Sequence, residues 1–193
     1  MKSAHRLDIE AHRRSRNWTR KELAARVLWA ASGPLFRLSP KILWEWRCFL
    51  LRAFGARIGR NVRILPSVRV MIPWNLTIDD EATVGDRAIL YALGPMHIGR
   101  RAVISQGSHL CGGTHDYTRA DFPLIKAAIS VGEGAWVCAD AFIGPDIRVG
   151  DYAVVGARSV VMKDVDAWTV VAGNPARYIS DRPELRPAGD ASQ

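Results

Sequence analysis

Residues 131–161 read VGEGAWVCADAFIGPDIRVGDYAVVGARSVV, and this stretch has an aliphatic residue at every sixth position. The same spacing recurs in three shorter runs on the N-terminal side. A six-residue period fits neither an α-helix nor a simple strand, and it is the repeat of a hexapeptide β-helix. The aliphatic residues of the four runs are Ile58, Ile64, Val70, Ile78, Val84, Leu90, Ile98, Ile104, Leu110, Val131, Val137, Ile143, Val149, Val155 and Val161.

Two other positions of the repeat favour small residues. The residue directly after the aliphatic one is often Gly, and the residue four positions after it is often Ala or Ser. In a coil of three short strands, the aliphatic side chain points into a narrow prism and the next residue lies where the backbone turns. The second small residue also points inward, where little room remains. Three hexads make one coil, and successive coils stack at ~4.8 Å through parallel strand pairing.

The interruptions of the repeat support this architecture. The steps from Val70 to Ile78 and from Leu90 to Ile98 are eight residues, and the step from Leu110 to Val131 is 21. Grouped in threes, all of these insertions fall at the same corner of the prism. We therefore expect an all-β parallel β-helix over residues 58–167, with a protruding loop near 116–128. The repeat indicates a fold and does not by itself indicate an activity.

The N-terminal segment is basic. Residues 1–60 hold 14 Lys and Arg against 4 Asp and Glu, whereas the whole chain has a net charge of +8. One helix is expected from Thr19 to Gly33-Pro34 and a second over residues 40–54. We interpret residues 1–57 as a mainly helical cap over the open strand edges of the first coil. The arginines and tryptophans also predict peripheral contact of residues 1–52 with an anionic membrane.

Other partners and compartments are less favoured. The sequence has no helix-turn-helix, zinc-finger or RNA-binding signature, so no nucleic acid is expected. Cys48, Cys111 and Cys138 lie in apolar contexts, which is typical of buried thiols in a reducing compartment. The apolar stretch 23–36 is too short to span a bilayer. These features predict a cytoplasmic protein at the inner face of the membrane.

Five histidines are candidates for chemistry. His5 and His12 lie in the N-terminal lead, where we expect them to be mobile and solvated. His97 and His109 come directly before strand starts. His115 lies in C-G-G-T-H-D, at the corner where the long insertion departs and where two glycines permit a ligand to approach the backbone. We predict that His115 is a general base.

These features resemble the hexapeptide-repeat acyltransferases, also called left-handed β-helix acetyltransferases, over residues 58–180. Within that family the chain is similar to the colanic acid biosynthesis acetyltransferases over residues 46–180. The words that carry both resemblances are W-R-C-F-L-L-R-A-F-G-A at 46–56, P-W-N-L-T-I at 73–78, I-S-Q at 104–106, L-C-G-G-T-H-D-Y at 110–117, G-A-W-V at 134–137, V-G-A-R-S-V-V-M-K-D at 155–164 and A-G-N-P-A-R at 172–177.

The resemblance implies a left-handed coil and a homotrimer with acetyl-CoA bound between subunits. It further implies direct acetyl transfer to a sugar hydroxyl of an exopolysaccharide or of its nucleotide- or lipid-linked precursor, with His115 and Asp116 as catalytic residues. Lys163 and Arg177 would contact the phosphates of the coenzyme, and residues 168–193 would form a coenzyme-contacting segment with a polar tail. The pantetheine channel would be lined by Trp136, Ala139 and Ala157.

The residues expected to bind the sugar acceptor depart from the family pattern. Sugar acetyltransferases of the maltose and galactoside type carry an asparagine upstream of the histidine, where this chain reads V-G-D-R-A-I. Asn75 is the nearest replacement and lies at the same corner of the prism. Asp116 or Tyr117 are the alternatives for orienting His115 or the acceptor.

Three other functions are compatible with the repeat. The chain could acetylate serine or an amino sugar, or it could be a non-catalytic hexapeptide scaffold. It could also be a zinc hydratase of the γ-carbonic anhydrase kind, with His97, His109 and His115 as ligands. The A-G-N-P-A-R tail argues against the hydratase, so no metal is expected.

Overall fold

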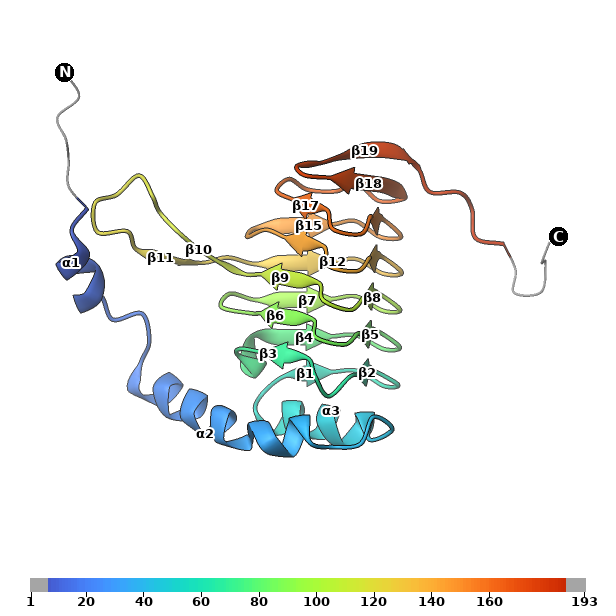
Figure 1. Ribbon diagram of the computed structural model, residues 1–193. Helices are drawn as coiled ribbons and strands as arrows, with labels where there is room; N and C mark the ends of the chain where they lie inside the picture. The colour runs from blue at the N-terminus through green and yellow to red at the C-terminus, as the bar shows by residue number, and fades with distance from the viewer. Residues whose placement is uncertain (1–6, 187–193) are drawn as a thin grey trace, which may run out of the picture.

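The computed structural model describes residues 7–186, so the interpretation of His5 lies outside the described residues. The chain forms a three-sided parallel β-helix with helices at its N-terminal end (Figure 1). The first sheet contains β1 (Arg57–Ile58), β4 (Leu76–Ile78), β7 (Met96–Ile98), β12 (Ile129–Val131) and β15 (Ile147–Val149). The second contains β2 (Arg63–Ile64), β5 (Thr83–Val84), β8 (Val103–Ile104), β13 (Trp136–Val137), β16 (Val154–Val155), β18 (Thr169–Gly173) and β19 (Ala176–Asp181). The third contains β3 (Arg69–Val70), β6 (Ile89–Tyr91), β9 (His109–Cys111), β14 (Phe142–Ile143) and β17 (Val160–Val161).

The predicted hexapeptide repeat is confirmed by strand register and burial. Ile58, Ile78 and Ile98 are direct partners in the first sheet, so equivalent aliphatic positions stack on one another along the prism. The small residues four positions later are also inside, and each is at most 1% exposed: Ala82, Ala88, Ala102, Ser108, Ala135, Ala141, Ala153 and Ser159. Thr114 has the same spacing but is half-buried, because it lies in the insertion.

The small residue after the aliphatic one is required by the neighbouring coil. A Cβ on Gly132 would lie 2.6 Å from the backbone nitrogen of Asp151, and one on Gly150 would lie 2.4 Å from that of Ala167. In most hexads the third residue after the aliphatic one has a positive φ, a feature that was not predicted from the sequence. These left-handed non-glycine residues are Asn61, Glu81, Arg87, Arg101, Asp140, Asp146, Tyr152, Arg158 and Trp168.

The insertions lie at one corner, as the spacing predicted. Each connects the third sheet to the first, and the first insertion contains a short 3-10 helix, η1 (Pro73–Asn75). The long insertion is a β-hairpin of β10 (Gly113–His115) and β11 (Leu124–Lys126), which projects away from the prism (Figure 1). The chain between these two strands, residues 116–123, has no strand structure.

Three helices precede the coil: α1 (Ile9–Arg14), α2 (Arg20–Arg37) and α3 (Trp44–Ala53). A capping box between Thr19 and Glu22 begins α2. The expected end at Gly33-Pro34 is wrong, since α2 continues to Arg37. Proline lacks an N–H, but its carbonyl still accepts from the backbone N–H of Leu38 at 2.9 Å. The last turn of α2 also buries Phe36 against the prism.

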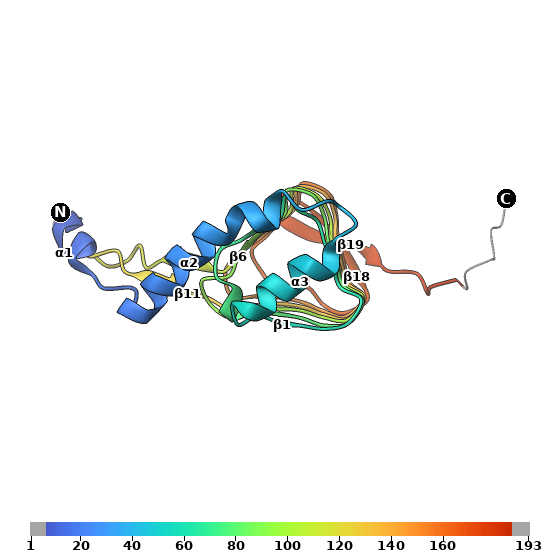
Figure 2. The same cartoon turned by 90° about the horizontal axis from the view of Figure 1, so that it is seen from below.

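The helix α3 lies across the open end of the prism, as expected for a cap (Figure 2). It begins at Trp44 rather than near Pro40, because buried Arg47 holds the preceding turn. The guanidinium of Arg47 donates to the carbonyls of Pro40 and Lys41. Within residues 7–186, no helix combines the length and apolarity needed to cross a membrane.

Candidate active site

The β10–β11 hairpin carries the predicted base. It leaves the coil through Gly112 and Gly113, where a side chain would collide with the chain beneath. A Cβ on Gly113 would lie 2.6 Å from a methyl group of Leu93. His115 pairs in register with Leu124 across the hairpin, so its position depends on both arms of the insertion.

The geometry of His115 selects one tautomer. Its Nδ1 lies 3.0 Å from the carbonyl oxygen of Phe122, and its ring stacks on the Phe122 ring with centroids 4.6 Å apart. A carbonyl oxygen can only accept a hydrogen bond, so Nδ1 carries the proton and Nε2 carries the lone pair. Phe122 has φ +47°, a left-handed conformation that is uncommon for an aromatic residue. In its neutral form the half-buried imidazole therefore has its lone pair on Nε2.

A second imidazole lies beside the first. The Nδ1 of His12 is 2.9 Å from the same carbonyl oxygen of Phe122, and the His12 and His115 ring centroids are 5.4 Å apart. The expectation that His12 is solvated in a mobile lead is wrong, because α1 packs on the hairpin. The backbone N–H of Asp8 also donates to the Ala120 carbonyl at 2.7 Å. No local sequence signal pairs positions this far apart in the chain.

The three residues predicted to orient His115 or the acceptor have contacts of their own. Asp116 accepts from the hydroxyl and backbone N–H of Thr118, which hold the pKa of its carboxyl below the ordinary value. The contact that orients the His115 ring is thus supplied by the Phe122 carbonyl. Tyr117 is 83% exposed at the hairpin tip. Asn75 donates to the carbonyls of Ala92 and Leu93 and so braces the next insertion.

The residues expected to bind coenzyme lie on other faces of the coil. Trp136 is in β13 of the second sheet, where its indole N–H donates to the Ser105 hydroxyl at 2.9 Å. Ala139 and Ala157 occupy successive turns after that sheet. Lys163 and Arg177 are exposed near the C-terminal end of the coil. The second sheet is opposite the corner from which the hairpin projects (Figure 2), so one chain does not bring Trp136 to His115.

The proposed zinc ligands are not assembled. His97 contacts the carboxylate of Asp79 at 2.8 Å on the outside of the first sheet. His109 packs edge-on against Tyr91 and Phe142, and burial lowers its pKa. Over residues 7–186 no group of three or more His, Cys, Asp or Glu side chains is placed to hold a metal ion. All three cysteines are free, but only Cys48 is fully buried; the prediction of buried thiols is wrong for Cys111 and Cys138, which are half-buried.

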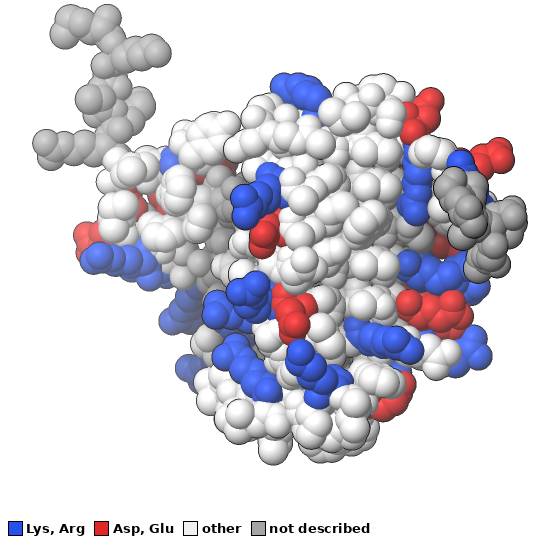
Figure 3. Space-filling view, turned by 45° about the vertical axis from the view of Figure 1, so that its right-hand side comes forward, with Lys and Arg blue, Asp and Glu red and all other residues white. Residues whose placement is uncertain are grey.

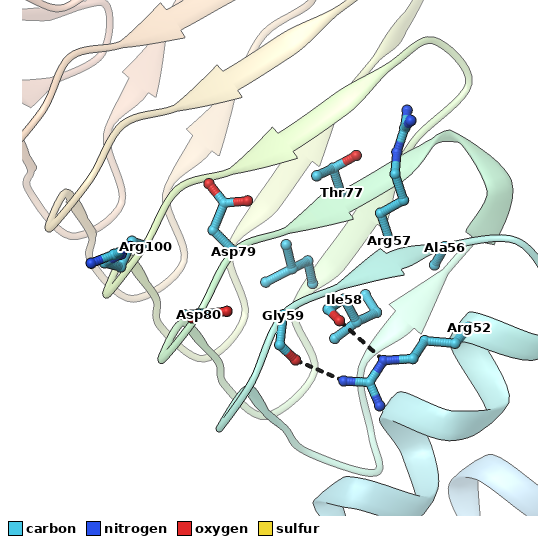
Figure 4. A pocket seen from close by; sticks show the side chains of 10 residues that line it. Arg52, Ala56, Arg57, Ile58, Gly59, Thr77, Asp79, Asp80 and Arg100 are labelled. Atoms are coloured by element: carbon cyan, nitrogen blue, oxygen red, sulfur yellow. Dashed lines mark hydrogen bonds between the residues drawn. The ribbon is translucent and has the colours of Figure 1, made fainter.

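A cavity of about 630 Å³ lies at the cap end of the first sheet (Figure 4). Arg52 points across it and donates to the carbonyls of Ile58 and Gly59. Asp79 and Asp80 line the same cavity, so its charge is mixed. It contains no residue of the hairpin and is separate from the His115 centre.

Comparison with known proteins gives a consistent set of relatives. No family model matches the chain. It is 46% identical over 162 residues to the Escherichia coli protein named "Putative colanic acid biosynthesis acetyltransferase WcaF", covering 84% of this chain and 89% of that protein. It is 27% identical to the galactoside O-acetyltransferase of Escherichia coli, covering 71% of this chain and 69% of the relative.

Solved structures share the fold. A hexapeptide-repeat-containing acetyltransferase of Vibrio cholerae O1 biovar eltor, complexed with acetyl coenzyme A, aligns with a TM-score of 0.79 at 21% identity, over 88% of this chain and 93% of that chain. A galactoside acetyltransferase in complex with coenzyme A also gives 0.79, at 23% identity over 86% and 84% of the two chains. These alignments confirm the left-handed β-helix that the resemblance implied.

Proposed function

The chain belongs to the hexapeptide-repeat acetyltransferase family, and we propose that it transfers an acetyl group from acetyl-CoA to a sugar hydroxyl during exopolysaccharide synthesis. The observation that carries this proposal is the orientation of His115. Its Nδ1 donates to the Phe122 carbonyl, which leaves Nε2 free to take a proton. A relative with 46% identity is named for colanic acid biosynthesis, which supports a polysaccharide sugar as the acceptor.

The chemistry required of the chain is proton transfer and positioning. Acetyl-CoA supplies the acetyl group. Nε2 of His115 takes the proton from the acceptor hydroxyl as that oxygen bonds to the thioester carbonyl carbon. The carbon–sulfur bond then breaks, and the same Nε2–H returns its proton to the departing sulfur. The hydrogen bond to Phe122 stabilises the imidazolium between these two transfers, because Nδ1–H remains a donor throughout.

We propose that the working site lies between two copies of the chain. The hairpin carries His115 away from its own coil, and the second-sheet residues expected to bind coenzyme are on the opposite side of the prism (Figure 2). A neighbouring copy supplies that face to the hairpin. A three-sided prism packs into a closed ring of three with identical contacts, so a homotrimer satisfies every site.

In this proposal, exposed cationic side chains bind the phosphates of the coenzyme, and a row of side chains on the second sheet lines the channel for its pantetheine chain. Lys163 and Arg177 are exposed near the C-terminal end of the coil and can reach phosphate groups in solution. Trp136 is 46% exposed, which leaves an aromatic surface for the pantetheine chain beside Ala139 and Ala157. In Lys163→Ala and Arg177→Ala we expect weaker coenzyme A binding, measured by calorimetry, with the turnover number less affected.

The test of the proposal is His115→Ala. If His115 is the base, turnover should fall by at least ~100-fold while coenzyme A binding remains within about twofold of the parent. His97→Ala is the matched control, because His97 lies outside the hairpin and contacts Asp79. The acceptor panel contains nucleotide sugars, oligosaccharides, serine and glucosamine. Near-normal turnover in His115→Ala would remove His115 from the mechanism, and transfer to serine or to an amine alone would reassign the acceptor.

We also propose that the helical cap contacts an anionic membrane on its cytoplasmic side. Its outer surface exposes large apolar side chains, including Leu38 at 83%, Ile42 at 73% and Phe49 at 57%. Trp46 and Phe49 stack on the outside of α3 with centroids 5.7 Å apart. Figure 3 shows a largely uncharged surface at the cap end, below Lys and Arg side chains that are interspersed with some Asp and Glu. An apolar face bordered by cations is typical of an interfacial helix.

Vesicle sedimentation tests this contact. The full chain should bind vesicles of phosphatidylcholine with phosphatidylglycerol and bind less to phosphatidylcholine alone. The double variant Leu38→Glu with Ile42→Glu should lose most of that binding without losing acetyl transfer to a soluble acceptor. Equal binding by parent and variant would leave α3 with a capping role alone.

A further inference from the structure

Two imidazoles share one backbone carbonyl at the catalytic centre. The Phe122 oxygen accepts from Nδ1 of His115 at 3.0 Å and from Nδ1 of His12 at 2.9 Å. A carbonyl has two lone pairs, so this pair of contacts satisfies it fully. His12 therefore has the same tautomer as His115, with its proton on Nδ1 and a lone pair on Nε2.

Both Nε2 atoms are available to a ligand. Within residues 7–186 neither has a hydrogen-bond partner and neither is among the buried unpaired polar atoms, so each can be reached by solvent. The rings are tilted by 57° and their centroids are 5.4 Å apart. Two neighbouring imidazoles, each with a solvent-accessible acceptor, can each meet a different hydroxyl of one sugar.

Residues 8–18 form an arm that carries His12, and this arm contacts the hairpin both before and after His12. Before His12, the Asp8 carboxylate caps α1 by accepting from Ala11, and the Asp8 N–H donates to Ala120. After His12, Lys126 of β11 donates to the Asn17 carbonyl at 2.8 Å and lies 3.7 Å from the centre of the Trp18 ring. The arm thus follows the hairpin from its tip to its base. The orientation of His12 is set by tertiary contacts rather than by α1 alone, which is only six residues long.

The carboxylate near His12 has another partner. Asp121 accepts from the guanidinium of Arg119 at 2.8 and 2.9 Å, and this pairing lowers the pKa of its carboxyl. His12 forms its hydrogen bond with Phe122 instead. Its ring is thus not needed as the counter-ion of Asp121.

We propose that His12 is a specificity-determining residue for the acceptor, with Nε2 accepting a hydrogen bond from a second hydroxyl of the sugar that His115 deprotonates. This inference rests on the proposed function. It assigns the acceptor class as a sugar with two free hydroxyls close enough to meet both imidazoles. A sugar that lacks the second hydroxyl leaves Nε2 of His12 unpaired in the complex and binds less well.

The variants His12→Asn and His12→Ala separate binding from structural support. The Asn amide can keep the donor that reaches the Phe122 carbonyl, but it has no counterpart of Nε2. We expect both variants to lower kcat/KM for the acceptor by about tenfold, the effect of one lost hydrogen bond. The KM for acetyl-CoA should change by less than about twofold. Glu10→Gln is the matched control on the same helix, because Glu10 contacts Arg14 and not the hairpin.

The probes are the methyl glycosides of galactose, glucose and fucose, and the best acceptor is then used with its monodeoxy derivatives. One monodeoxy acceptor should lose reactivity with the parent enzyme and show no further loss with either His12 variant. Parent-like kcat/KM in His12→Asn, or equal losses for all monodeoxy acceptors, would overturn the assignment and leave His12 as support for the hairpin. No transfer by the parent enzyme to any glycoside, nucleotide sugar or oligosaccharide would instead overturn the proposed sugar acceptor, and the inference with it.

Discussion

Replacement of Arg47 should destabilise the cap more than any exposed substitution. Arg47 is fully buried, and its guanidinium donates to the Ile64 carbonyl at 2.6 Å, the Ser39 hydroxyl at 2.8 Å and the carbonyls of Pro40 and Lys41. Burial lowers its pKa, because the charged form loses hydration. These contacts join the α2–α3 turn, α3 and the first coil through one side chain.

The size of the effect follows from the groups left unpaired. Arg47→Met keeps the apolar stem and removes every donor, so the carbonyls of Ile64 and Lys41 lose the guanidinium. The Pro40 carbonyl still accepts from the Leu43 N–H, and the Ser39 hydroxyl still donates to the Phe36 carbonyl. Each buried unpaired group costs about 1–3 kcal/mol, but the partners outside Ile64 are partly buried and recover water. Removing a buried charge also returns part of its desolvation cost. We therefore expect a net loss of about 2–4 kcal/mol.

Thermal unfolding followed by tryptophan fluorescence measures this loss, at one fixed protein concentration because assembly contributes to stability. For a chain of this size the Tm should fall by roughly 5–15 °C. Arg47→Lys should be intermediate, since an ammonium cannot reach all four acceptors. The matched control is Arg69→Met on β3, where the side chain is exposed. A Tm for Arg47→Met within about 2 °C of the parent, or an equal fall in the control, would refute the account of the cap.

Two further perturbations test the hairpin and the core. A Cβ on Gly94 would lie 2.3 Å from the Ala127 carbonyl oxygen, so Gly94→Ala should displace the base of β11 and lower kcat/KM by about tenfold or more. The control is Gly33→Ala, because a Cβ on Gly33 has no atom within 4 Å. Equal activity in the two variants would contradict this reasoning. Burial raises the pKa of Cys48 to about 11 from 9.0, so the unfolded chain loses that proton first and stability should decline between about pH 9 and pH 11, by an amount on the order of 2 kcal/mol. Cys48→Ala should lose this part of the pH dependence in denaturant titrations, and an unchanged slope would count against it.

The coil could be predicted because each repeat position is fixed by its own local geometry. Ile78 fills the prism, whereas Ala82 lies where little room remains. This alternation of large and small residues can be recognised in the sequence alone. The left-handed turn residues could not be predicted in the same way. They include Arg101, Tyr152 and Trp168, residue types with no preference for positive φ. Their conformation is imposed by hydrogen bonds to the adjacent coils, which compensate for local strain.

The candidate site was predicted only in part, for a related reason. His115 is marked by the glycines before it and by the insertion after it. Its partner is a backbone carbonyl, and no residue type at position 122 signals that role. His12 is more than 100 positions away and reaches the hairpin only through the docking of α1. Sequence signals predicted the helix that begins at Thr19, but they could not predict where α1, which precedes that helix and carries His12, would lie.

In this chain the contacts that stabilise the fold and the contacts proposed to select the acceptor lie in different parts of the molecule. The prism is held by stacked aliphatic side chains and parallel strands, whereas His115, Phe122 and His12 all lie on segments that leave it. His12 of α1 and His115 of the insertion in the middle of the coil meet at one carbonyl oxygen. Substitutions in the arm or at the hairpin tip can therefore alter the acceptor side without creating cavities in the core. Under the proposed function the second sheet binds the coenzyme, so a new acceptor would require changes only in the α1 arm and the β10–β11 hairpin.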